Sequence, residues 1–63
     1  MGFEKVTLNT AEEVGIEGAY FYEGTMFIPS EGVTEEALEK FKEEIFGKII
    51  VSNAGDEVAI DFV

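Results

Sequence analysis

The sequence predicts an α+β fold: a small antiparallel β-sheet, with the order βββαββ along the chain, and one α-helix packed on one face of the sheet. Three observations support this prediction. One segment has helical apolar spacing, two glycine-containing turns join short apolar runs, and 46% of the 63 residues are hydrophobic. We expect residues 1–63 to form a single compact domain of marginal stability, because a small domain buries a small share of its surface.

The clearest predicted element is a helix over residues 35–46. Thr34 is a good N-cap, and two glutamates follow it in the first turn, where the helix dipole favours negative charge. Leu38, Phe41 and Ile45 recur at helical spacing, and a glycine directly after the segment provides a stop signal. We therefore expect these three side chains to form the buried face of the helix.

The other apolar segments are short and read as strands. They cover residues 3–8, 16–22, 25–28, 48–52 and 57–62. A capping-box pattern over residues 10–13 predicts a single helical turn after the first strand. Glu23 and Gly24 form a two-residue hairpin turn, and residues 53–56 have the composition of a second one. Strands joined by hairpins favour an antiparallel sheet.

The turn at Glu23 and Gly24 sets a register that divides the first hairpin into two faces. In this register Ala19, Phe21, Met26 and Ile28 point toward the helix, and Tyr20, Tyr22, Thr25 and Phe27 lie on the open face. A three-residue loop would invert the assignment. Tyr20, Tyr22 and Phe27 are either a partly solvated strand face or a self-association interface, since aromatic side chains concentrate at binding hot spots.

The residue inventory excludes most chemistry. The chain has no histidine and no cysteine, so the commonest general base and the strongest nucleophile are missing. No phosphate-binding loop or calcium-binding loop is present. We therefore expect no enzyme activity, no catalytic residues, no cofactor and no metal site.

The same inventory indicates a compartment. The absence of cysteine favours a reducing cytoplasm, and the N-terminal residues do not have the pattern of a signal peptide. No apolar stretch approaches the roughly 20 residues of a membrane span. We expect a cytoplasmic protein, located in the host cytoplasm if it is viral.

Net charge is the strongest functional signal. The chain carries 14 acidic and 4 basic side chains, a net charge of −10, and a surface this negative repels nucleic acids and anionic membranes. Glu35, Glu39 and Glu43 form a row on the predicted helix, with carboxylates about 6 Å apart along its axis. Glu36 and Glu44 are placed to pair with Lys40, which leaves the row less neutralised.

Two hypotheses of different class follow. The leading one is a small acidic binding protein that inhibits or occupies a basic, nucleic-acid-binding protein partner through Glu35, Glu39 and Glu43. Such a DNA mimic is typical of phage and mobile-element inhibitors. The alternative is a structural or assembly subunit, such as a virion component or accessory protein, that forms a homodimer through its aromatic sheet face. The acidic row is then only a solvated helix face. Salt weakens the first kind of contact and not the second.

Overall fold

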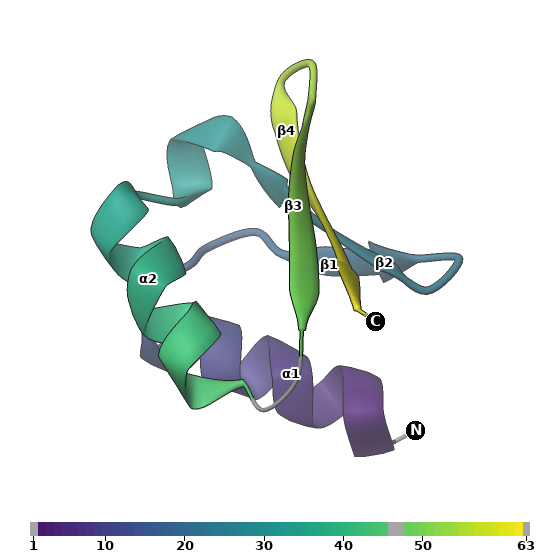
Figure 1. Cartoon of the computed structure of the whole chain (residues 1–63), viewed down its shortest axis with the longest axis vertical. Helices are drawn as coiled ribbons and strands as arrows, with labels where there is room; N and C mark the ends of the chain where they lie inside the picture. The colour runs from purple at the N-terminus through teal and green to yellow at the C-terminus, as the bar shows by residue number, and fades with distance from the viewer. Residues whose placement is uncertain (1, 46–47, 63) are drawn as a thin grey trace.

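The computed structural model describes residues 2–45 and 48–62, which form one four-stranded antiparallel sheet and two α-helices (Figure 1). The elements are α1 (Gly2–Glu13), β1 (Tyr20–Tyr22), β2 (Thr25–Pro29), a 3₁₀ turn (Ser30–Gly32), α2 (Glu35–Glu44), β3 (Ile49–Ala54) and β4 (Glu57–Phe62). The predicted α+β class is confirmed. The predicted order βββαββ and the single helix are wrong, because the chain begins with a second helix.

The segment over residues 3–8 is helical and belongs to α1. This helix buries two small side chains, Thr7 and Ala11, one turn apart. The Thr7 hydroxyl donates a hydrogen bond of 2.7 Å to the Phe3 carbonyl, so a polar side chain is buried with its donor satisfied. The helical turn predicted over residues 10–13 is the last turn of α1.

A Schellman motif ends α1 and delays the first strand. Gly15 adopts a left-handed φ of 98°, and the Ile16 N–H donates to the Ala11 carbonyl at 2.9 Å. The Glu17 N–H then donates to the Gly32 carbonyl at 2.8 Å. A Cβ at Gly32 would overlap the Glu17 carbonyl oxygen, so this close approach requires glycine. The predicted strand over residues 16–22 is therefore shortened to β1.

The first hairpin has the predicted register. Tyr20 pairs with Phe27 and Tyr22 with Thr25, so the loop contains two residues. Both loop residues have positive φ, 51° at Glu23 and 84° at Gly24, which is the pattern of a type I′ turn. The turn that was predicted over residues 53–56 is shorter, because β3 continues to Ala54 and only two residues separate it from β4.

The helix α2 confirms the predicted start. Thr34 is the N-cap, and its side-chain oxygen accepts a hydrogen bond of 3.1 Å from the Ala37 N–H. The helix ends at Glu44, two residues earlier than predicted, and residues 46 and 47 lie outside the described residues. Phe41 is fully buried as predicted, whereas Leu38 and Ile45 are only half-buried.

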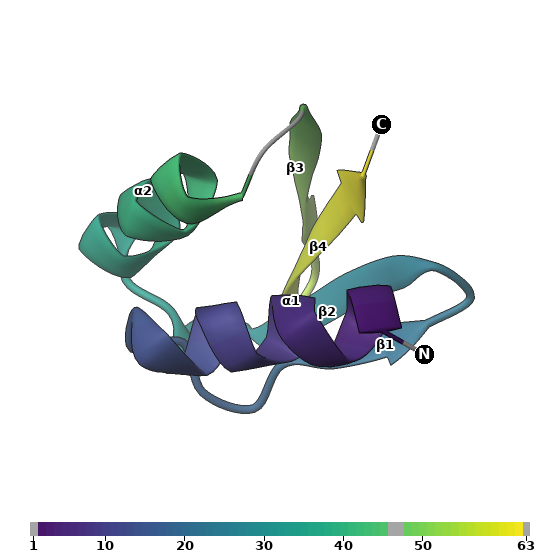
Figure 2. The ribbon, with the colours of Figure 1, turned by 90° about the horizontal axis from the view of Figure 1, so that it is seen from below.

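Both helices cover the same face of the sheet (Figure 2). The sheet has the strand order β1-β2-β4-β3, so β2 and β4 are central. Their inward side chains join both helices in one buried cluster: Ala11, Ile16, Met26, Ile28, Ala37, Phe41 and Ile60. The opposite face of the sheet is covered by neither helix. Two surfaces therefore remain as candidates for binding: the outer face of α2 and the open face of the sheet.

Candidate protein-binding surfaces

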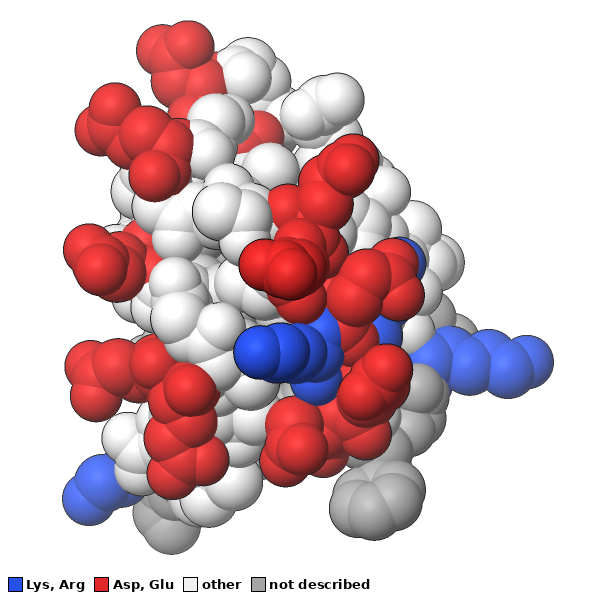
Figure 3. Space-filling view, turned by 90° about the vertical axis from the view of Figure 1, so that its left-hand side faces the viewer, with Lys and Arg blue, Asp and Glu red and all other residues white. Residues whose placement is uncertain are grey.

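The acidic row lies on the outer face of α2. Because Ala37 and Phe41 are buried, the helix rotation is fixed and Glu35, Glu39 and Glu43 are exposed. The space-filling view of this side of the molecule shows acidic side chains from top to bottom, separated by uncharged surface, with lysine side chains between some of them (Figure 3). The structure thus places the three predicted residues together on one accessible helix face.

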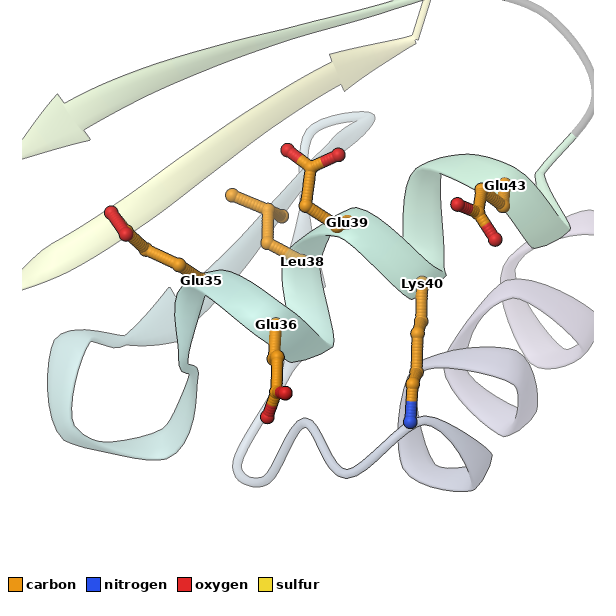
Figure 4. Close-up of a pocket in the computed structure, with 6 residues that line it drawn as sticks. All are labelled: Glu35, Glu36, Leu38, Glu39, Lys40 and Glu43. Carbon is orange, nitrogen blue, oxygen red and sulfur yellow. The ribbon is translucent and has the colours of Figure 1, made fainter.

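The row is a spiral stripe rather than a straight line. Residues four apart on an α-helix are offset by about 40° around the axis, so Glu43 is rotated by about 80° from Glu35. In the close-up, Glu35 and Glu39 extend from the same side of α2 as Leu38, whereas Glu43 points in a different direction (Figure 4). These side chains line a shallow hollow whose residues are Glu35, Glu36, Leu38, Glu39, Lys40 and Glu43. Half-buried Leu38 is the one apolar residue of this lining, among four glutamates and Lys40.

Ion pairing on α2 differs from the prediction. Lys42 Nζ lies 3.8 Å from Glu39 Oε2, and both side chains are exposed, so this pair contributes about 0–1 kcal/mol. Within the described residues, Lys40 makes no ion pair with Glu36 or Glu44. The expectation that Lys40 neutralises these two glutamates is therefore wrong. The one partly neutralised member of the row is Glu39.

The second candidate surface is the open face of the sheet. The structure places Tyr20, Tyr22 and Phe27 on it as predicted, and 43% of Tyr20 and 62% of Tyr22 are exposed. The rings of Tyr20 and Phe27 stack with their centroids 5.6 Å apart. That this face mediates self-association stays a prediction.

Two carboxylates also lie on the open face, and the sequence reasoning did not find them there. The Tyr20 hydroxyl donates a hydrogen bond of 2.5 Å to Glu57 Oε2, and Thr25 Oγ1 donates one of 2.7 Å to Asp61 Oδ1. The hydrogen bond to Glu57, together with desolvation and the nearby negative charge, raises the pKa of Tyr20 above its usual value. Glu57, Ala59 and Asp61 alternate with larger apolar residues, and this alternation could have placed both carboxylates on one face of the strand from the sequence alone.

In residues 2–45 and 48–62, no group of three or more acidic side chains is arranged to hold a metal ion. No helix of this part of the chain has the length and apolar character needed to cross a membrane. No protein-family model matches the sequence, and neither a curated protein nor a solved structure matches it. The functional proposal therefore rests on the two surfaces themselves.

Proposed function

We propose that the protein is a small acidic binding protein that occupies a basic, nucleic-acid-binding surface of another protein, with α2 as the contact. The observation that carries the proposal is the exposed row of Glu35, Glu39 and Glu43 on a helix held in place by buried Phe41. A row fixed by packing keeps its charges in place before the partner arrives, which lowers the ordering cost of binding.

Charge supports the same proposal. A net charge of −10 attracts a basic partner over long range and raises the association rate at low salt. The carboxylates are spaced about 6 Å apart along the helix, whereas phosphates advance about 3.4 Å along one DNA strand. The stripe therefore carries its negative charges at a wider spacing than a DNA strand does, and it winds around the helix axis. The exposed atoms of half-buried Leu38 between the carboxylates add an apolar contact.

The test is reversal of the row with a matched control. Lysine at 35, 39 and 43 changes three charges by two each, so the net charge goes from −10 to −4. Lysine at Glu12, Glu13 and Glu31 gives the same net charge while leaving the row intact, and these three side chains are also exposed. We expect the wild type and the control variant to capture a basic partner from cell extract, and the row variant to lose it.

The captured protein is then challenged with salt and DNA. We expect release between about 50 and 500 mM salt, because exposed charges are screened beyond a Debye length of about 10 Å at 0.1 M. Duplex DNA should displace the acidic protein if both occupy one site. Equal losses in the two charge variants would show that only net charge matters. Retention by the row variant would reject α2 as the contact.

A second candidate is an assembly subunit that self-associates through the open sheet face, and the exposure of Tyr20 and Tyr22 supports it. Two copies meeting on this face would also bring Glu57 and Asp61 of each close to those of the other, and this repulsion disfavours the contact. Sedimentation of the wild type and of Tyr20→Glu at tens of micromolar tests it. Association that Tyr20→Glu abolishes would favour this candidate.

A further inference from the structure

The strand β3 is an edge of the sheet, paired with β4 on one side only. Natural edge strands are commonly protected by lysine, proline, a bulge or a covering segment, or are very short. The other edge, β1, has three residues, whereas β3 has six, and these are Ile-Ile-Val-Ser-Asn-Ala without a charge or a proline. In Figure 1 the tip of the β3–β4 hairpin stands clear of both helices. Within residues 2–45 and 48–62, the long edge therefore has none of these kinds of protection.

Exposed apolar side chains occupy both faces of this edge. Ile50 lies on the open face of the sheet, and Val51 lies on the face that the helices cover elsewhere. Their exposed fractions are 55% and 37%. An additional strand alongside β3 would cover both, because cross-strand neighbours contact side chains on each face.

The distribution of charge along the chain indicates which molecule provides the additional strand. Acidic residues occur at 44 and at 56, and the eleven residues between them contain none, the longest acid-free stretch of the chain. Lys48 is the one charge within it. Two molecules that each carry −10 repel one another over most of their surfaces, and β3 is where they can approach without placing acid against acid.

Backbone geometry restricts how two β3 edges pair. A two-residue turn is closed by a hydrogen-bonded pair, here Ala54 and Glu57, and such pairs alternate along an antiparallel ladder. Val51 then directs its N–H toward the free edge. The same alternation puts Pro29, which lacks an N–H, at a non-hydrogen-bonded position opposite Glu57, as a ladder requires.

We propose that β3 pairs antiparallel with β3 of a second copy of this chain, which joins two four-stranded sheets into one of eight strands. With a two-fold axis between the copies, the alternation allows a register in which Ser52 lies opposite Ser52 of the second copy. That register brings Lys48, the residue just before β3, to the end of the strand pair at which the β3–β4 turn of the second copy carries Asp56. Ile50 then lies beside Ala54 of the second copy.

Salt separates this contact from binding of a basic partner. Attraction to a basic protein weakens as salt rises, whereas repulsion between two copies of net charge −10 is screened and the dimer tightens. The two proposals can therefore fail independently. Sedimentation equilibrium of the full chain at about 50 and about 500 mM salt should give a reversible dimer that is more populated at the higher salt.

Three variants locate the contact. Ile50→Lys puts a charge on the edge opposite Asp61 of its own chain, so it leaves β3–β4 pairing intact. Val51→Pro removes an N–H at the free edge. Val6→Lys is the matched control, since it also replaces an exposed apolar residue and also changes the net charge from −10 to −9. We expect about a tenfold or greater loss of dimer affinity in the two β3 variants and none in the control.

Hydrogen exchange gives an independent measurement. The amide protons of β3 should exchange more slowly as the protein concentration rises, and those of β1 should not change. A wild type that stays monomeric up to about 1 mM in high salt, a concentration at which even a millimolar Kd gives substantial dimer, would overturn the proposal. A dimer that survives Ile50→Lys but is lost in Tyr20→Glu would move the interface to the open sheet face and overturn it as well.

Discussion

The two helices cover the same face of the sheet by opposite means. The helix α2 inserts one large ring, Phe41, which is completely buried, whereas α1 buries the small side chains of Thr7 and Ala11. Small residues let a helix backbone approach its neighbours closely, and a large ring holds a helix at a greater distance by filling the gap. The fully buried part of the interior therefore contains one bulky ring from α2 and only small side chains from α1, with Leu8 of α1 packed partly buried against it.

Their outer surfaces differ as well. The exposed side of α2 carries the acidic row, whereas α1 exposes two apolar residues, Phe3 and Val6. Phe3 lies edge-on to Phe21 and Phe62, with ring centroids 6.1 Å and 5.3 Å away. These two rings therefore cover part of the Phe3 side chain. A helix with a deep anchor can give its whole outer face to charge, and α2 does so.

Removal of the α2 anchor should have the largest effect. Phe41→Ala should lower the free energy of unfolding by about 3–5 kcal/mol, because it deletes a fully buried ring, and this is enough to unfold much of a domain of this size. Leu38→Ala should cost less, about 1–2 kcal/mol, because Leu38 is only half-buried. Urea unfolding followed by circular dichroism measures both. Equal losses would mean that Phe41 is not the main anchor.

Added bulk in α1 should have the next largest effect. Ala11→Leu introduces a branched side chain at a site with no exposed surface, and we expect a loss of about 1–3 kcal/mol. Val6→Leu makes a similar change on the exposed side of the same helix and should stay within about 0.5 kcal/mol of the wild type. An Ala11→Leu variant as stable as the wild type would show that α1 is not closely packed.

The same difference explains why one helix was predictable and the other was not. In α2 the buried positions are apolar and recur at helical spacing, and Thr34 marks the start. In α1 the buried pair one turn apart is Thr7 and Ala11, and a threonine does not register as apolar. Of the large apolar residues, Phe3 and Val6 are exposed and Leu8 is only partly buried, so they do not mark the buried stripe and the segment resembles a strand. Its helical period is visible only when small and polar core residues are counted.

The candidate surfaces were predictable to the extent that they depend on local geometry. The row on α2 follows from helical spacing alone, and the aromatic face follows from the two-residue turn at Glu23 and Gly24. The carboxylates of the open face depend on pairing between β2 and β4, whose paired residues are 28 to 34 positions apart along the chain. The free edge of β3 depends on the strand order. Such non-local pairing is not encoded in any one segment.

Loss of the α2 cap should have a smaller effect. Thr34→Ala removes the oxygen that accepts from the Ala37 N–H and should lower the free energy of unfolding by about 1 kcal/mol. Thr34→Ser keeps that acceptor and should remain close to the wild type. A chemical unfolding series on the three proteins measures this, and similar losses in both variants would point to the lost methyl group rather than to the cap.

The smallest expected effect lies on the sheet face that neither helix covers, and it is a shift in the titration of Tyr20. The chain has two tyrosines, so Tyr22→Phe leaves Tyr20 as the one phenol that absorbs as tyrosinate. In that background the pKa of Tyr20 should lie above 10.0, because the neutral hydroxyl donates to Glu57, and Glu57→Gln should lower it.

The raised pKa of Tyr20 also makes stability depend on pH. The neutral phenol loses its proton and becomes negatively charged as the pH rises, and it does so at a lower pH in the unfolded chain than in the folded one. The contribution of Tyr20 to stability is therefore complete below about pH 10 and is lost as the pH rises through the folded-state pKa. Unfolding measured above pH 10 should show this decline in the wild type and less of it in Glu57→Gln, whereas identical curves would mean that the Tyr20–Glu57 hydrogen bond does not persist in solution.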